Sequence, residues 1–339
     1  MKYFRLAGSR VIKTGVAIFI TAWICVLLEW PPVFAVITAI VTIEPTVSDS
    51  IKKGIIRFPA SAIGSAYAVL FISLFGNSPL TYTLAAVFTI ATCFRLKLHA
   101  GLLVATLTSV AMIEVIHSNI LTAFFIRLGT TTTGLVVSTA VNMLMLPPDY
   151  TKEIAKKLET IAYKTGIAIE KVFHDILDDQ HQVTVVEQEL AEQLDRIIHQ
   201  TEQLIRFQKE ESKYHPLAGS ERTQFQQEQD QLVRLRLIHY HIGNLVYTSF
   251  NKVEWSADKR TTILNAVTEM AQSLKHPDAY EQPKHREYYK QLTAIFWGNN
   301  KSITVKNEQH PANLPANLII LYELLSIYNL VERYYQKPT

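Results

Sequence analysis

The sequence predicts an all-α fold class, in which a six-helix transmembrane domain over residues 1–148 precedes a cytoplasmic α-helical bundle over residues 149–339. Three observations support this prediction. Long apolar runs fill residues 11–146 and are separated by short loops. Lys and Arg occur in every second loop. From Tyr150 onward, apolar residues recur at helical spacing, and no run there is long enough to cross a bilayer.

The positive charges that lie in loops of the first half are confined to alternate loops. The loops near Pro31, Gly76 and Ser118 contain no Lys or Arg. The segments between them contain Lys2, Arg5, Arg10 and Lys13; then Lys52, Lys53 and Arg57; then Arg95 and Lys97; and finally Lys152, Lys156 and Lys157. Because Lys and Arg resist translocation, this pattern predicts a multi-pass plasma-membrane protein with both termini in the cytoplasm.

Charge also separates the two halves. Ten basic and five acidic residues precede Tyr150, whereas 23 basic and 25 acidic residues follow. The basic excess lies at the ends of apolar runs, which indicates contact with anionic lipid headgroups rather than nucleic acid. Cys25 and Cys93 both lie inside predicted spans, so no disulfide is expected.

Six spans are predicted in the first half. The first is treated as a transmembrane helix rather than a signal peptide, because further spans follow it at once. The second is short and carries Glu44 and Pro45 near its inner end, and residues 48–54 are predicted to form a basic loop. The spans cover residues 11–30, 33–47, 58–75, 80–94, 100–116 and 120–146.

The second half predicts a bundle of amphipathic helices. The first begins near Tyr150, because Ile154, Leu158, Ile161 and Ile169 follow helical spacing. Pro277, Pro283 and the Asn299–Asn300 region are predicted to break the chain. Later helices are expected over residues 186–211, 224–251, 257–274 and 314–335.

The residues do not indicate an enzyme. No Gly-rich phosphate-binding loop follows a strand, so neither a nucleotide site nor another cofactor is expected. His239 and His241 are two residues apart, which directs them to different helix faces, and they are interpreted as ordinary structural histidines. No metal site is predicted.

A polar stripe in the sixth span is the strongest candidate site, because ionisable residues inside a membrane are costly and commonly functional. Helical spacing places its residues on one face, and Thr130 adjoins them: Arg127, Thr131, Gly134, Ser138 and Asn142. A cation on such a stripe predicts a path for an organic anion. In the alternative interpretation, Arg127 extends to the outer surface or pairs with Glu114 or Glu29, while the small residues only pack.

Two carboxylates are candidates for proton coupling. Glu44 precedes Pro45, which removes a backbone donor and loosens the helix. The alternative for Glu44 is an interfacial carboxylate paired with Lys52, Lys53 or Arg57. Glu114, with His117, lies near the outer end of the fifth span, where simple interfacial exposure is the alternative.

The stretch over residues 35–46, AVITAIVTIEPT, carries a family resemblance. Together with Ser48, Lys53, Gly54, Arg57 and Gly64, and with Arg10, Lys13, Thr14 and Ala17 of the first span, it resembles the aromatic acid exporter family. That family is grouped with the fusaric acid resistance proteins and the p-hydroxybenzoic acid efflux pumps. The chain looks like the short Bacillus-type members, which have one six-span half and a C-terminal helical domain. In this resemblance Pro45, Gly54, Arg57 and Gly64 are structural motif positions.

The resemblance implies efflux of aromatic carboxylates or related organic anions across the plasma membrane, driven by the proton gradient. Larger relatives carry two six-span halves, so a homodimer is expected for this chain. The expected partners are therefore membrane lipid, a small organic anion and a second copy, with no nucleic acid. Two other functions remain open: a passive anion channel, because plant anion channels share the six-span plan, and a membrane-anchored interaction or scaffold protein.

Overall fold

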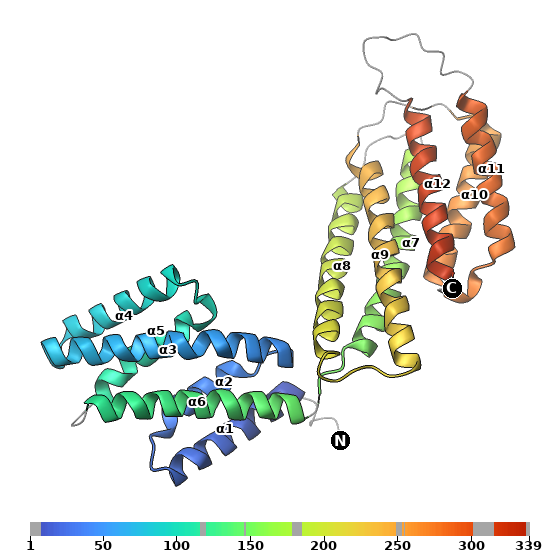
Figure 1. Cartoon of the computed structure of the whole chain (residues 1–339). Helices are drawn as coiled ribbons and strands as arrows, with labels where there is room; N and C mark the ends of the chain where they lie inside the picture. Colours follow the sequence, from blue (N-terminus) through green and yellow to red (C-terminus); the bar gives the residue numbers. More distant parts are fainter. Residues whose placement is uncertain are drawn as a thin grey trace. The chain divides into compact units, whose positions relative to one another are not determined.

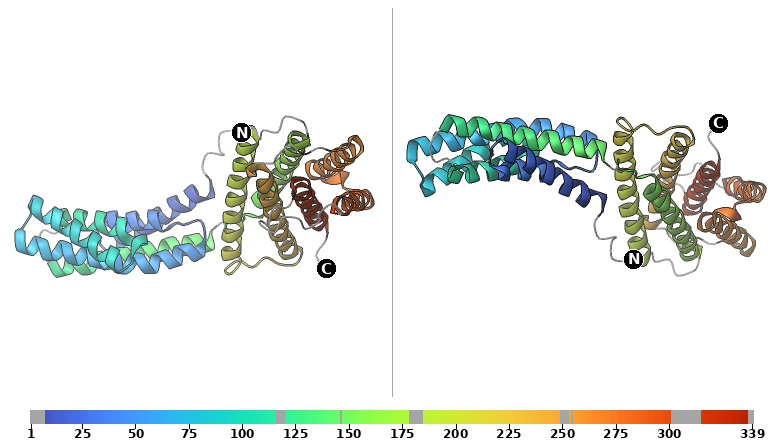
Figure 2. Two further views of the ribbon diagram at one scale, coloured as in Figure 1. Left: turned by 90° about the horizontal axis from the view of Figure 1, so that it is seen from above. Right: turned by 90° about the horizontal axis from the view of Figure 1, so that it is seen from below.

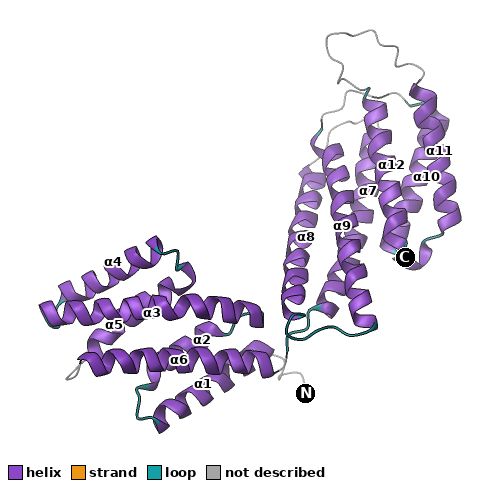
Figure 3. Ribbon diagram, in the orientation of Figure 1, coloured by secondary structure: helices purple, strands orange, loops and turns teal. Residues whose placement is uncertain are grey.

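The computed structural model describes residues 8–115, 120–145, 147–177, 185–248, 253, 255–300 and 315–336. In these residues the regular structure is helical, and Figure 3 draws no strand among them. The all-α prediction is confirmed. The chain forms two compact units, one of residues 1–149 with 207–216 and one of residues 150–206 with 217–339.

Six described helices precede Asp149 and form the first unit together with residues 207–216 (Figure 1). Three of them, over Ser9–Leu27, Val47–Phe75 and Leu121–Leu144, are long and apolar enough to cross a membrane, while Pro32–Thr42 and His99–Glu114 are shorter apolar helices. The helices are α1 (Ser9–Leu27), α2 (Pro32–Thr42), α3 (Val47–Phe75), α4 (Pro79–Arg95), α5 (His99–Val115) and α6 (Ile120–Leu144).

In the first unit many large apolar side chains are exposed, while several polar and charged side chains are buried. Helix α1 exposes Phe19 and Trp23, yet it buries Lys13 and Thr21. Such an inverted distribution suits a lipid environment, where polar groups must find partners within the protein. Figure 2 shows these helices, coloured blue to green, from two further sides.

Small residues allow the helices of this unit to approach closely. A Cβ atom added to Gly64 of α3 would lie 2.6 Å from the carbonyl oxygen of Ala105 in α5. One added to Gly134 of α6 would lie 2.5 Å from the carbonyl oxygen of Ala35 in α2. The predicted motif glycine Gly64 and the stripe glycine Gly134 are therefore both at tight helix crossings.

The predicted basic loop over residues 48–54 is wrong. The chain leaves helical geometry earlier, at Ile43, and α3 begins at Val47. Thr46 caps α3 by accepting a hydrogen bond from the Asp49 N–H at 3.1 Å. Gly54 is consequently a buried helical residue rather than a loop residue.

The second unit contains the remaining described helices: α7 (Thr151–Leu177), α8 (Val185–Glu211, whose last turn belongs to the first unit), α9 (Ser220–Tyr247), α10 (Ala257–Lys275), α11 (Gln282–Asn300) and α12 (Ala316–Tyr335). A single apolar core joins them, including Phe173, Leu235 and Tyr328. Helix α11 was not expected, because Pro283 was read as a break. Pro283 instead lies in the first turn of α11, where a missing N–H costs nothing.

A pair of acidic side chains in the second unit predicts a pH-dependent stability. Burial, together with a hydrogen bond to Glu187, raises the pKa of Asp175 from its ordinary 3.8 to about 6. The folded protein therefore holds a proton that the unfolded chain releases, and stability falls as the pH rises from about 4 to about 6. Asp175→Asn should flatten this fall and stabilise the protein at pH values above this range. The gain should be only about 1 kcal/mol, because solvent screens the partly exposed carboxyl.

The measurement is the Tm of the full-length protein in detergent micelles, at about pH 5 and about pH 8. Asp278→Asn, at an exposed carboxyl, is the matched control. An equal pH dependence in wild type and Asp175→Asn would contradict the prediction.

Candidate functional site

The polar stripe of α6 lies on the buried face of that helix. Arg127, Thr131, Gly134, Ser138 and Asn142 are all buried, as is Thr130. These side chains therefore share one face of α6, as their helical spacing predicts. The structure nevertheless separates them into two groups, because Asn142 lies fifteen positions after Arg127, about 22 Å along the helix at its usual rise per residue.

Arg127 is 2% exposed and has threonine rather than carboxylate neighbours. Its Nη1 donates to the Thr131 hydroxyl at 2.7 Å and to the Thr130 hydroxyl at 3.5 Å. Its guanidinium carbon lies 4.6 Å from the centroid of the Phe34 ring, in cation–π geometry. The Nε and Nη2 groups are buried and have no hydrogen-bond partner in the described part of the chain.

Neither alternative for Arg127 describes this geometry. The side chain does not extend to the surface, and among the described residues it forms no ion pair with Glu29 or Glu114. The exposed Glu114 instead accepts a hydrogen bond from the Tyr82 hydroxyl. His117 lies outside the described residues.

Asn142 belongs to the break between α2 and α3. Its Nδ2 donates to the Glu44 carbonyl at 3.1 Å, to the Thr46 carbonyl at 3.4 Å and to the Ser50 hydroxyl at 2.9 Å. Its Oδ1 accepts from the Lys13 ammonium at 2.9 Å. Asn142 therefore supplies partners to backbone that has left the helix. Between the two groups, the Ser138 hydroxyl donates to the Gly134 carbonyl at 2.5 Å.

Glu44 is paired with two cations of α3. Its carboxylate accepts from Lys53 at 2.8 Å and from the Arg57 Nη2 at 2.7 Å. The Arg57 Nε donates to the Ala100 carbonyl at 3.2 Å, and its Nη1 is buried without a partner in the described structure. The pairing alternative for Glu44 thus describes this structure, and its role in proton coupling stays a prediction.

Residues 207–216, which comprise the last turn of α8 and the loop after it, belong to the same compact unit and bring two further carboxylates to the start of α3. Glu211 accepts from the Val47 N–H at 3.1 Å, and Glu210 pairs with the exposed Lys52 at 3.4 Å. Helix N-termini favour negative charge, which accounts for these positions. No sequence pattern in residues 207–216 indicated this contact.

Buried cations outnumber buried carboxylates in the described part of the first unit, where Glu211 of α8 has 1% of its side chain exposed. Among residues 8–145 as described, Lys13, Arg57 and Arg127 are buried, at 4%, 6% and 2% exposure. Glu44 keeps 11% of its side chain exposed, and the other carboxylates of the same described residues are half-buried or exposed. Lys13 was expected among the flanking loop charges, but it lies inside α1. Such an interior favours an anion and repels a cation.

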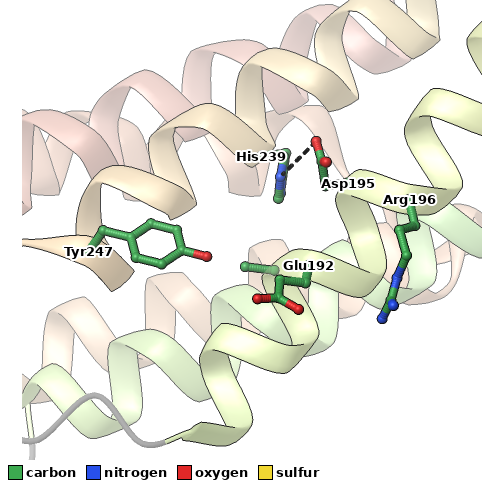
Figure 4. A pocket seen from close by; sticks show the side chains of 6 residues that line it. Glu192, Asp195, Arg196, His239 and Tyr247 are labelled. Atoms are coloured by element: carbon green, nitrogen blue, oxygen red, sulfur yellow. Dashed lines mark ion pairs between the residues drawn. The ribbon is translucent and has the colours of Figure 1, made fainter.

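The second unit contains a cavity of about 400 Å³ (Figure 4). It has a different character, because its lining from α8 and α9 is acidic on balance: Ala191, Glu192, Asp195, Arg196, His239 and Tyr247. His239 lies 3.9 Å from Asp195, and burial lowers the pKa of His239 despite the opposing effect of that carboxylate. His241 instead pairs with Glu323. In the described residues, no three His, Cys, Asp or Glu side chains gather in a way that suits a metal.

Comparison with known proteins connects this core to a transporter family. A family model described as aromatic acid exporter family member 1 matches residues 5–145. A UPF0421 protein of Oceanobacillus iheyensis is 50% identical over 99% of this chain and 97% of its own length. A UPF0421 protein of Bacillus cereus is 40% identical over 98% and 94%, and one of Staphylococcus haemolyticus is 35% identical over 98% of each.

The match and the apolar helices identify a membrane protein, and the family is one of transporters rather than enzymes. The matched residues include the break at Glu44, the buried Arg57 and the stripe of α6. The resemblance inferred from residues 35–64 is thereby confirmed. The chain belongs to the aromatic acid exporter family, among its short UPF0421 members.

Proposed function

We propose that this protein is a secondary exporter of aromatic carboxylates or related organic anions. It works in the plasma membrane as a homodimer, with six crossings per subunit, both termini in the cytoplasm and transport driven by the proton gradient. One observation carries the proposal: Arg127 is a buried cation with two donor nitrogens, Nε and Nη2, that have no hydrogen-bond partner, and it has no acidic partner in the described structure. An anion is the ligand that such a group lacks.

The surroundings of Arg127 suit an aromatic carboxylate. The carboxylate accepts from Nε and Nη2, which form one edge of the guanidinium fork. The ligand ring then packs beside Phe34, whose own ring already lies against the guanidinium. Thr130 and Thr131 hold the opposite edge of Arg127 and orient the fork. Ser138 lies two turns further along the same face.

Glu44 and Glu114 are the proposed proton sites. Glu44 lies at the break between α2 and α3 and is held by two cations. Glu114 is exposed near the C-terminal end of α5. Both are carboxylates that can exchange protons with water on their own side of the membrane. This assignment is separate from the assignment of Arg127 to the anion.

The test is the steady-state accumulation of a panel of radiolabelled aromatic acids in bacterial cells that do or do not express the chain. Expression should lower the accumulation of at least one acid, and a protonophore should remove the difference. A flux that survives the protonophore and follows the membrane voltage would identify the passive anion channel instead. Unchanged accumulation of every acid would refute both functions.

A further inference from the structure

We propose that Arg57 forms a second carboxylate-binding subsite, which the chain's own Glu44 occupies in this structure and which the transported anion takes over by displacing Glu44. The inference rests on the proposed function and adds a step to it. Arg57 and Arg127 would then bind the anion in turn, the first at the break and the second further along the core.

Arg57 has the features of a built anion site. Its side chain is 7% exposed, and its Nε is fixed by the Ala100 carbonyl of α5 at 3.2 Å. Nη2 already binds a carboxylate, that of Glu44, at 2.7 Å. Nη1 is buried and has no partner among the described residues. The Glu44 carboxylate therefore satisfies only part of the donor fork, and a bidentate carboxylate would satisfy more of it.

Glu44 can leave this position without unfolding the break. Its backbone N–H donates to the Ser50 hydroxyl at 3.2 Å, and its carbonyl accepts from Asn142 at 3.1 Å. These bonds hold the main chain independently of the carboxylate. The carboxylate also binds Lys53, which is more exposed than Arg57 and gives it a partner after displacement.

The charges around the break favour the exchange. Arg10 donates to the Ile43 carbonyl at 3.0 Å, and Lys13 binds Asn142, so α1 adds two cations next to Glu44. Glu210 binds Lys52 and Glu211 binds the Val47 N–H, and among the described residues no hydrogen bond or ion pair links either carboxylate to Arg57. An incoming anion thus meets a cationic cluster in which one carboxylate, that of Glu44, holds Arg57.

The experiment measures binding of radiolabelled benzoate to the purified full-length protein in detergent micelles. Arg127→Gln serves as the background, so that the site at Arg127 does not contribute to the measured binding. Adding Glu44→Gln removes the internal competitor and should tighten benzoate binding about tenfold. Adding Arg57→Gln to that double variant should abolish the gain. Lys52→Gln, which removes a nearby exposed cation instead, is the matched control and should preserve the gain.

Each result is decisive. No gain from Glu44→Gln overturns the subsite without any change to Arg57, so a misfolded Arg57 variant does not obscure the answer. A gain that persists in Arg57→Gln also overturns it. Failure of the exporter function is a different result: cells then show no efflux, whatever benzoate does in micelles. Benzamide, which lacks the carboxylate, should not bind to any of these variants.

Discussion

Arg127→Ala is expected to abolish efflux while the protein remains in the membrane at wild-type abundance. The substitution removes both free donors and the only charge that the described residues place beside Phe34. Loss of a charge-assisted, bidentate interaction reduces binding on the order of 100-fold. The fold should survive, because truncation leaves no carboxylate unpaired, and Thr130 and Thr131 keep their bonds to the backbone carbonyl of residue 127.

The measurement compares initial efflux rates and membrane abundance for a small series of variants. Arg127→Lys keeps the charge but loses the fork, so it should retain a small fraction of the rate. Thr132→Ala, at an exposed threonine in the same helical turn, is the matched control and should transport normally. Wild-type efflux by Arg127→Ala would remove Arg127 from the anion site.

The helical organisation could be predicted because it depends on local composition. Apolar runs and alternating charge indicated the helices before Asp149, and helical spacing placed Arg127 and Thr131 on one buried face. The early start of α3 also had a local signal, since Thr46 and Asp49 stand at the spacing of an N-terminal cap. The prediction of a basic loop over residues 48–54, with Lys52 and Lys53, does not use this signal.

The partners of each side chain could not be predicted, because they come from remote parts of the sequence. Lys13 and Asn142 are 129 residues apart, yet they share a hydrogen bond. Phe34 reaches Arg127 from a different helix. Spacing within one helix tells which residues share a face, but it carries no information about the opposite helix. For this reason Asn142 was grouped with Arg127, although it binds the break.

Asn142→Ala is expected to destabilise the protein by about 3 kcal/mol. The amide group serves four partners: the Lys13 ammonium, the Ser50 hydroxyl and the carbonyls of Glu44 and Thr46. Alanine leaves these polar groups short of a partner, and the buried Lys13 loses its side-chain acceptor. The Tm of the full-length protein in detergent micelles, followed by circular dichroism, measures the effect.

Two further variants separate the causes of that loss. Asn142→Asp keeps an acceptor for Lys13 but loses the donors to the break, so its Tm should fall between those of wild type and Asn142→Ala. Met143→Ala, at an exposed neighbour, should leave the Tm unchanged. If Asn142→Ala keeps the wild-type Tm but loses efflux, Asn142 contacts the anion after all, and the separation of the α6 stripe into a binding part and a structural part is wrong.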